Sequence, residues 1–310
     1  MRRYVLDLII KSRLIMNLKF LVVAVAGLLM GLLPVSAQKK MDNVFYVQNT
    51  MGGFRNAPQT AQQKAEILKT IGFNGLEGFG YDGFFELKKA LDQEGIAMPV
   101  NYVELKFEAD GMLETKSASE IKEMIKASAK GAVIYFHLHS DKYKTDREAG
   151  DQVVAKILRE LADYSVPFGI KLCAYPHADL YCETVEHSVK LAKMVDRKNY
   201  GAAMNLCHLL KVEGSTSIEQ KIRELAPYLF AVNICGADDG DTKVLGWDKL
   251  IQPLGEGTFD TYLFVKTLID NGYHGPFGLQ CYNLKGDAKE TLTRSMKVWK
   301  GYQKRYVREK

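Results

Sequence analysis

Residues 171–212 constrain the fold of this chain more than any other stretch. A short apolar run at 169–174 is typical of a buried strand, and Pro176 ends it because proline cannot donate to a strand ladder. Apolar residues then recur at three- and four-residue spacing over 185–195, which is the period of a helix. A second apolar run follows at 202–206. The stretch therefore predicts a strand, a helix and another strand.

A histidine follows each of these two strands, His177 after the first and His208 after the second. In parallel α/β folds, ligands bind at the C-terminal ends of the strands. We therefore expect both imidazoles to lie near a functional site.

The alternation of strand and helix continues along the whole chain, about eight times. The predicted strands are 44–47, 72–77, 97–103, 132–137, 169–174, 202–206, 229–234 and 277–280. The predicted helices are 58–71, 84–93, 117–130, 147–164, 185–195, 219–226, 259–270 and 288–302, with a charged, solvated end after Tyr302. This order predicts a single-domain α/β fold, a closed (β/α)8 TIM barrel. An open doubly wound sheet is the alternative, but no GxGxxG follows the first strand to favour it.

The first 37 residues are predicted to be a signal peptide with an upstream extension. Residues 20–33 form an apolar run of about 14 residues, which is too short to span a membrane. Residues 35–37 (Val-Ser-Ala) fit a cleavage site, Met16 fits the true start, and 38–310 would form the barrel. We expect a periplasmic or secreted protein with no stable membrane anchor after cleavage; a retained anchor is the alternative. Cleavage would leave an N-terminus near Gln38.

Removal of this segment also removes most of the positive charge. Residues 1–37 carry five basic residues and one acidic residue, so the formal net charge of +5 falls to about +1. No stripe of Lys and Arg interleaved with aromatic residues is present, and we expect no nucleic-acid partner. The five cysteines, all after residue 37, have no CxxC spacing and are predicted to be buried free thiols.

Four segments carry a resemblance to a known family: GFNGLE at 72–77, NLCH at 205–208, PLGEGTFD at 253–260 and GYHGPFGLQ at 272–280. They resemble the xylose isomerase-like TIM barrels, the sugar phosphate isomerase/epimerase group, over nearly all of 38–310. The resemblance implies one divalent metal at the C-terminal face of the barrel. Its usual ligands are an acidic residue after strand five, the Asp of a D-x-x-H after strand six, a His on strand seven and a Glu on strand eight.

This sequence departs from that ligand pattern at every position. Tyr175, Asn205, Asn233 and Gln280 occupy the four places, and none of them is a carboxylate or a histidine. Neutral amides offer a divalent cation only a weak carbonyl oxygen. The usual ligand set is therefore lost.

A bound Mn, Co or Zn would require a shifted set of ligands. The candidates are His139, His177, His208 and Glu77, with His137 on the same strand face as His139. Glu77, His177, His208 and Tyr175 are also the candidate catalytic residues, because proton abstraction next to a carbonyl needs a carboxylate or an imidazole. A structural alternative stands beside each: a carboxylate bonded to loop amides, or a histidine in a core hydrogen bond.

The candidate substrate-binding residues share polar or aromatic side chains near predicted strand ends or in late loops. They are Asn205, Asn233, Gln280, Lys243, Lys285, Trp247 and Tyr282. Amides offer sugar hydroxyls both a donor and an acceptor, tyrosine and tryptophan can stack on a sugar ring, and lysine can bind an anion or enolate. Ordinary packing for the amides and Trp247, and solvation for the lysines, are the alternatives.

The resemblance implies an exported sugar isomerase or epimerase that removes a proton next to the carbonyl of a sugar or keto-sugar. A lyase or hydratase acting on 3-keto-glycosides or derived enones is one alternative, and a non-catalytic carbohydrate-binding barrel is another. In each case the expected partner is a small-molecule carbohydrate. An endonuclease-like barrel is disfavoured, because both the metal carboxylates and a basic surface are missing.

Overall fold

The computed structural model describes residues 40–108 and 115–309, and residues Met41–Glu309 form one compact unit. The predicted signal segment at 1–37 lies outside the described residues. No helix in the described part of the chain combines the length and the apolar composition that crossing a membrane requires.

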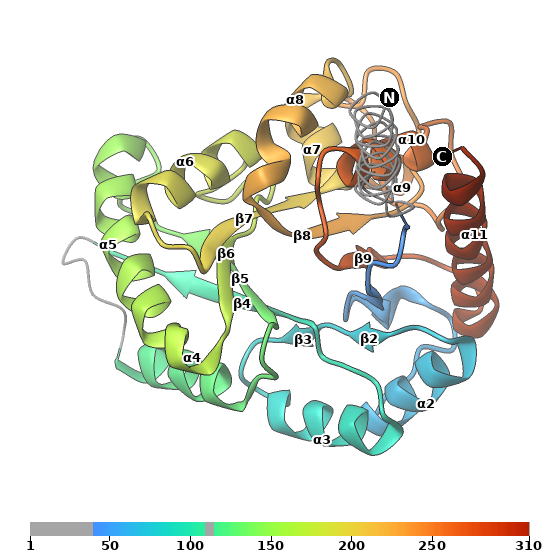
Figure 1. The fold of residues 1–310 in the computed structure, drawn as a ribbon, viewed down its shortest axis with the longest axis horizontal. Helices are drawn as coiled ribbons and strands as arrows, with labels where there is room; N and C mark the ends of the chain where they lie inside the picture. The colour runs from blue at the N-terminus through green and yellow to red at the C-terminus, as the bar shows by residue number, and fades with distance from the viewer. Residues whose placement is uncertain (1–39, 109–114, 310) are drawn as a thin grey trace, which may run out of the picture. The chain divides into compact units, whose positions relative to one another are not determined.

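The strands of this unit form one sheet in which all neighbours are parallel, in the order β2-β1-β9-β8-β7-β6-β5-β4-β3 (Figure 1). They are β1 (Phe45–Val47), β2 (Gly75–Leu76), β3 (Gly78–Phe79), β4 (Val100–Lys106), β5 (Val133–His139), β6 (Lys171–Ala174), β7 (Tyr200–Asn205), β8 (Leu229–Ile234) and β9 (Phe277–Leu279).

The two end segments of this order, β2 and β3, are parts of one barrel strand separated by Glu77. β2 pairs with β1, and β3 pairs with β4. The sheet therefore closes on itself through the interrupted strand, and the predicted eight-stranded TIM barrel is confirmed.

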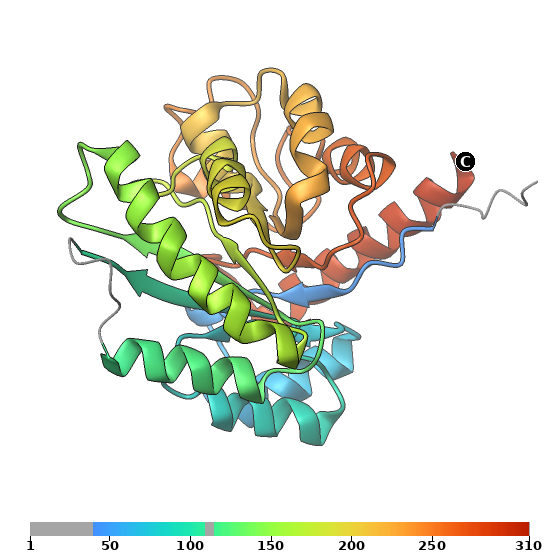
Figure 2. The same cartoon turned by 60° about the vertical axis from the view of Figure 1, so that its left-hand side comes forward.

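Helices surround this barrel on the outside (Figures 1 and 2). The α-helices are α2 (Ala61–Ile71), α3 (Phe84–Glu94), α4 (Thr115–Ala127), α5 (Arg147–Ser165), α6 (Val185–Val195), α7 (Leu206–Glu213), α8 (Ile218–Leu225), α9 (Trp247–Leu250), α10 (Thr261–Asp270) and α11 (Ala288–Arg308). Short 3-10 turns η1 (Met51–Gly53), η2 (Val166–Phe168) and η3 (Ala226–Tyr228) complete the described elements.

Side-chain caps explain where several helices begin. Thr60 caps α2 in a capping box with Gln63, so this helix starts later than the predicted residue 58. Asp260 accepts a hydrogen bond from the amide of Leu263 and sets the start of α10, two residues after the predicted position. All eight predicted helices are present, whereas α7 and α9 were not predicted.

The start of α7 and the end of α11 both differ from the sequence prediction. Residue 206, predicted to end a strand, begins α7 instead. The side chain of Asn205 caps this helix, because its Oδ1 accepts a hydrogen bond of 3.1 Å from the amide of Cys207. The segment after Tyr302 is mostly exposed, as predicted, but it is helical and anchored by one buried side chain. It continues α11 to Arg308, and the buried Tyr306 donates a hydrogen bond of 2.8 Å to Asp270 of α10.

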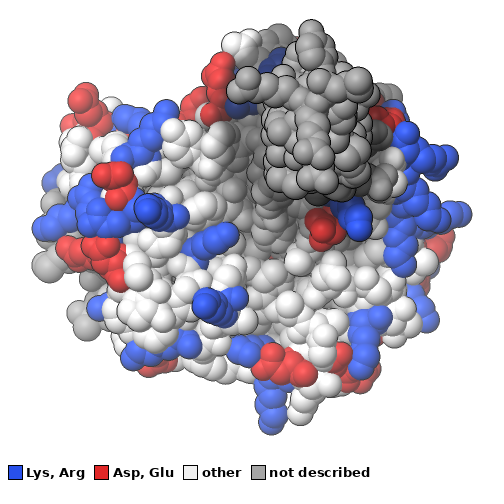
Figure 3. Space-filling view, viewed as in Figure 1, with Lys and Arg blue, Asp and Glu red and all other residues white. Residues whose placement is uncertain are grey.

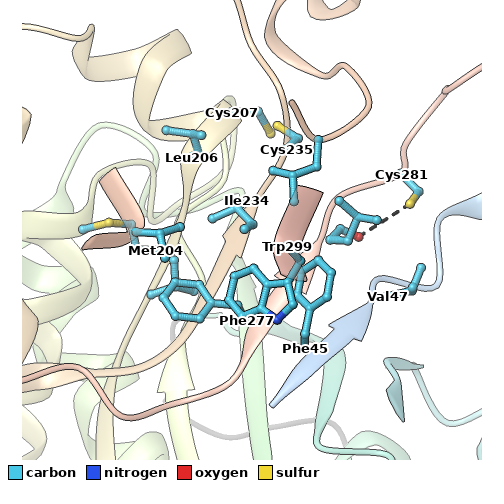
Figure 4. Close-up of a cluster of buried hydrophobic side chains, with 14 of the residues drawn as sticks. Phe45, Val47, Met204, Leu206, Cys207, Ile234, Cys235, Phe277, Cys281 and Trp299 are labelled. Atoms are coloured by element: carbon cyan, nitrogen blue, oxygen red, sulfur yellow. Dashed lines mark hydrogen bonds between the residues drawn. The ribbon is translucent and has the colours of Figure 1, made fainter. Parts of the chain in front are cut away.

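Figure 4 shows how the last helix packs on the strands next to the closure. The ring of Trp299 in α11 stacks on Phe45 of β1, with centroids 4.2 Å apart, and lies 5.4 Å from Phe277 of β9. Such aromatic pairs bury large apolar areas and hold the helix against the barrel. Cys207, Cys235 and Cys281 lie in the same cluster, and all five cysteines are buried and free, as predicted.

Candidate functional site

Three tyrosines fill the barrel interior among smaller residues. The interior cluster consists of Tyr46, Val100, Val133, Tyr135, Cys173, Tyr175, Ala203 and Ala231. The Tyr46 hydroxyl donates to Asn233 Oδ1 at 2.7 Å, and Asn233 Nδ2 donates to the Tyr135 hydroxyl at 3.3 Å. Tyr135 in turn donates to the carboxyl group of Glu77. These bonds join opposite sides of the barrel and satisfy phenols and amides that are otherwise costly to bury.

Glu77 is 1% exposed and lies at the gap between β2 and β3. Gln48 Nε2 donates to its Oε1 at 3.2 Å, and the backbone amide of Asn49 donates to its Oε2 at 3.3 Å. Burial raises the pKa of Glu77 to about 8, although the bonds from Gln48 and Asn49 act in the opposite direction. Glu77 is therefore largely a neutral acid at pH 7.

A cavity of about 360 Å³ opens above this network. It is lined by Gln48, Thr50, Glu77, Phe79, Tyr102, Tyr175, His177, Asp179, His208, Trp247, Ile251, Gln280 and Tyr282. These residues follow or end most of the barrel strands, so the cavity lies at the C-terminal face, where (β/α)8 enzymes place their active sites. Its size is that of a small-molecule pocket.

His177 and His208 form an imidazole pair in the wall of this cavity. Their ring centroids are 3.9 Å apart, with the planes inclined at 39°. His177 lies in the loop after β6, whereas His208 lies in the first turn of α7 rather than in a loop. Trp247 packs edge-on against His208, with centroids 5.3 Å apart.

Both imidazoles contact the backbone of one residue, Ala178. His177 Nδ1 lies 2.7 Å from the Ala178 carbonyl oxygen, and the Ala178 amide lies 3.4 Å from His208 Nδ1. Burial lowers the pKa of His177 and lowers that of His208 well below its ordinary value. Both rings are therefore neutral at pH 7.

A second histidine pair lies on β5 beside the cavity. His137 Nδ1 is 3.1 Å from His139 Nε2, as expected for residues on one strand face, and the His137 ring stacks on Tyr102 at 4.2 Å. Burial, with smaller contributions from His139 and His177, lowers the pKa of His137 to about 3. His139 lines a neighbouring groove with Glu104 rather than the cavity itself.

Comparison with known proteins decides the family. The family model described as "Xylose isomerase-like TIM barrel" matches residues 65–302, which is most of the chain. The chain belongs to this family. No curated protein matches the sequence.

Solved structures show the same fold at low sequence identity. A xylose isomerase-like TIM barrel/4-hydroxyphenylpyruvate dioxygenase fusion protein is 15% identical with a TM-score of 0.65, covering 86% of this chain; this chain spans 44% of that protein's length. The IOLI protein with a bound zinc atom is 17% identical with a TM-score of 0.65, over 84% of this chain and 98% of its own. The 3-keto-D-glucoside 4-epimerase YcjR from E. coli is 16% identical with a TM-score of 0.63, over 84% and 99%.

The residues at the family's metal positions do not fit a divalent cation here, because their oxygen atoms are already bonded. Asn233 Oδ1 accepts from Tyr46, and Asn205 Oδ1 accepts from the amide of Cys207. Gln280 Oε1 accepts from the Thr50 hydroxyl and from the amide of Tyr282, both at 3.0 Å.

Tyr175 occupies the fourth metal position, and its phenol accepts a hydrogen bond from Asn205 Nδ2. Burial raises the pKa of Tyr175 well above its ordinary value, so this phenol stays neutral. A neutral phenol and three occupied amides lack the negative charge that a divalent cation requires.

The shifted metal set is not assembled either. Within residues 40–108 and 115–309, no group of three or more His, Cys, Asp or Glu is placed to hold a metal ion. Glu77, His177 and His208 do line one cavity, but His139 faces the neighbouring groove. The structure therefore brings three of the four candidates to one cavity, and a metal ligand set drawn from them stays a prediction.

The cavity brings together seven of the residues singled out from the sequence: Glu77, Tyr175, His177, His208, Trp247, Gln280 and Tyr282. Asn205 and Asn233 are buried beside it and act through hydrogen bonds to the tyrosines. Lys243 and Lys285 do not line it; both are exposed, and the carbonyl of Lys243 accepts a bond from Lys211 while Lys285 bonds Asn283.

Sequence reasoning missed six lining residues: Gln48, Thr50, Phe79, Tyr102, Asp179 and Ile251. Gln48, Thr50 and Phe79 follow or end the first two strands, so the strand-end rule that selected His177 could have found them. Tyr102 lies within β4, where no sequence signal separates it from an ordinary core tyrosine.

Proposed function

We propose that this protein is an enzyme that moves a proton at a carbon next to the carbonyl group of an uncharged sugar or keto-sugar. Isomerisation and epimerisation are both reactions of this kind. The observation that carries the proposal is the neutral imidazole pair of His177 and His208 in a cavity that also contains the Glu77 carboxyl group. A neutral imidazole can accept a proton from carbon, and a neutral carboxyl group can donate one.

The two kinds of proton-transfer group approach the cavity from opposite sides. In the closed sheet order, three strands separate β7 from the β2–β3 strand in either direction. His208 follows β7 and Glu77 interrupts the β2–β3 strand, so a ligand in the cavity lies between the imidazoles and the carboxyl group. Epimerisation removes a proton from one face of a carbon and adds a proton to the opposite face, and this placement of the groups fits that requirement.

The lining chemistry supports an uncharged carbohydrate. None of the described lining residues is Lys or Arg, so the cavity offers a phosphate group no cationic partner, and the acidic side chain of Asp179 disfavours an anion. The aromatic rings of Phe79, Trp247 and Tyr282 offer apolar faces to a sugar ring.

Polar groups at the base of the cavity can bind sugar hydroxyls. Gln48 lines the cavity, and its buried Oε1 has no hydrogen-bond partner among the described residues. An unpaired buried oxygen is unfavourable, and a hydroxyl group that donated to it would remove the penalty. Gln280 also lines the cavity. Its Oε1 accepts from Thr50, and its side-chain NH2 group can donate to a sugar hydroxyl.

The experiment is hydrogen–deuterium exchange in heavy water, followed by NMR, with free aldoses, ketoses and 3-keto-glycosides as substrates and the matching sugar phosphates as controls. We expect exchange at one carbon next to the carbonyl of an uncharged substrate and little or none with the phosphates. Binding across the panel without exchange or conversion would contradict the proposal and favour a non-catalytic carbohydrate-binding barrel.

The same spectra separate the lyase or hydratase alternative. The fold likeness to a 3-keto-D-glucoside 4-epimerase favours keto-glycosides as substrates to include. An elimination begins with the same proton removal, but it ends with a new enone signal and a released glycosidic group. Epimerisation leaves the glycoside intact. Export through residues 1–37 stays a prediction, to be checked by mass spectrometry of the mature N-terminus.

A further inference from the structure

The two imidazoles contact complementary backbone groups of Ala178. The carbonyl oxygen of Ala178, 2.7 Å from His177 Nδ1, can only accept a hydrogen bond. The amide N–H of Ala178, 3.4 Å from His208 Nδ1, can only donate one. His177 must therefore carry its proton on Nδ1, and neutral His208 must carry its proton on Nε2.

We infer that the two histidines have different and fixed roles: His177 Nε2 is the base that takes the proton from carbon, and His208 Nε2–H is the donor that holds the substrate oxygen. This assignment rests on the proposed function and deepens it. Ala178 is then a positioning residue, since its backbone acts on the reaction only through the two rings.

The loop around Ala178 is built to hold these backbone groups in place. The His177 amide donates to the Cys182 carbonyl at 2.9 Å, and the Leu180 amide donates to the His177 carbonyl at 3.2 Å. Asp179 takes a left-handed backbone conformation with φ of 68°, which is unfavourable for a residue with a side chain. Its amide donates to Glu183 Oε1 at 2.8 Å, which helps to hold that conformation.

The proton and electron balance follows from these roles. His177 Nε2 takes the proton, and the C–H electron pair forms a carbon–carbon double bond while the carbonyl π pair moves to oxygen. His208 Nε2–H donates a hydrogen bond to that oxygen and keeps its proton. The imidazolium of His177 can then return the proton to the same carbon. For isomerisation it goes to the neighbouring carbon, while the hydroxyl proton of the first carbon passes to the former carbonyl oxygen. For epimerisation Glu77 delivers a proton from the opposite side, and the proton left on His177 then passes through solvent to the Glu77 carboxylate, which restores both groups. No oxidant, reductant or metal takes part.

The most direct test measures the tautomers themselves by ¹⁵N NMR of the imidazoles in the resting protein. The chain has six histidines, so His177→Gln and His208→Gln spectra assign the two resonances. We expect His177 protonated at Nδ1 and His208 protonated at Nε2, both neutral at pH 7. Identical tautomers, reversed tautomers or a charged ring would overturn the inference.

This measurement needs no substrate, so it can fail or succeed independently of the proposed function. Where the exchange assay gives a substrate, variants test the roles. His177→Gln cannot accept a proton and should lower exchange about 10²-fold or more. His208→Gln keeps an N–H donor and should retain at least about tenfold more exchange than His208→Leu. Equal loss in both His208 variants would contradict its role as a donor.

Discussion

At the scale of single residues, Glu77 shows how burial changes the chemistry of an ordinary carboxyl group. It is enclosed by donors from Gln48, Asn49 and Tyr135 at the point where a barrel strand is interrupted. Desolvation nevertheless dominates and raises its pKa to about 8. The folded protein therefore holds a proton on Glu77 at pH values where the unfolded chain has lost it.

This difference predicts a pH-dependent stability that Glu77→Gln removes. Between about pH 5 and 8 the folded state binds one more proton at this site, so the free energy of unfolding should fall by up to about 1.4 kcal/mol per pH unit. The contribution of Glu77 to stability is fully present below its pKa in the unfolded chain, and it is lost as the pH rises through its pKa in the folded protein. Urea unfolding of both proteins across this range measures the difference. Parallel curves for wild type and Glu77→Gln would contradict it.

Some site residues could be predicted from sequence because their position alone carries the signal. His177 and His208 follow apolar runs and therefore mark the C-terminal ends of parallel strands. Lys243 and Lys285 were also singled out but do not line the cavity, because a loop position does not fix the direction of a long side chain. The roles that we propose for the two histidines could not be predicted from sequence, because they depend on the directions of the carbonyl and amide groups of Ala178.

At the scale of elements, a buried ion network joins α5, α6 and the loop that carries His177. Asp151 of α5 is 1% exposed and accepts hydrogen bonds from Tyr181 at 2.8 Å, from His187 Nε2 at 2.7 Å and from Lys190 at 2.7 Å. Burial alone would raise the pKa of Asp151, but the bonds from His187 and Lys190 lower it below its ordinary value. The charged carboxylate therefore stabilises the folded state.

Asp151→Asn should destabilise the protein by about 1.5–3 kcal/mol, because it weakens bonds between a charged acceptor and several donors. In the wild type, the contribution of Asp151 to stability should be fully present above its pKa in the unfolded chain. It should disappear as the pH falls through its lower pKa in the folded protein. Chemical unfolding at pH 7 measures the loss. Asp163→Asn is the matched control on the same helix: its pair with Arg197 is exposed, and its unfolding midpoint should barely change. Equal effects would contradict the account.

Element boundaries explain most remaining differences between sequence and structure. The segment at 206–210 is apolar enough to continue a strand, and its helical form depends on the cap that Asn205 supplies. The C-terminal end of α11 is charged, but Tyr306 packs beneath it and bonds Asp270. The start of α7 therefore depends on a single capping side chain, and the end of α11 depends on a contact with a residue distant in sequence. Neither is visible in the local sequence pattern.

At the scale of the whole compact unit, the repeated strand–helix pattern was sufficient to predict the barrel. Sequence could not show that closure passes through an interrupted strand with Glu77 at the gap. On the face in Figure 3, both basic and acidic side chains lie around the periphery, with several basic side chains gathered at the right-hand edge. The absence of a nucleic-acid partner stays a prediction.

We propose that imidazoles, without a bound metal, carry the proton transfer in this barrel. The neutral, hydrogen-bonded side chains at the family's ligand positions and the His177–His208 pair support this proposal. The claim predicts that chelation leaves the reaction intact while a single histidine substitution does not.

The most direct measurement is the rate of substrate C–H exchange in heavy water before and after exhaustive EDTA treatment, in wild type and in His177→Gln. We expect the wild-type rate to stay within about twofold after EDTA treatment. The rate of His177→Gln should be lower than that of wild type by at least about 10²-fold, with or without EDTA. Loss of wild-type exchange on EDTA treatment, with recovery on adding Zn, Mn or Co, would contradict it.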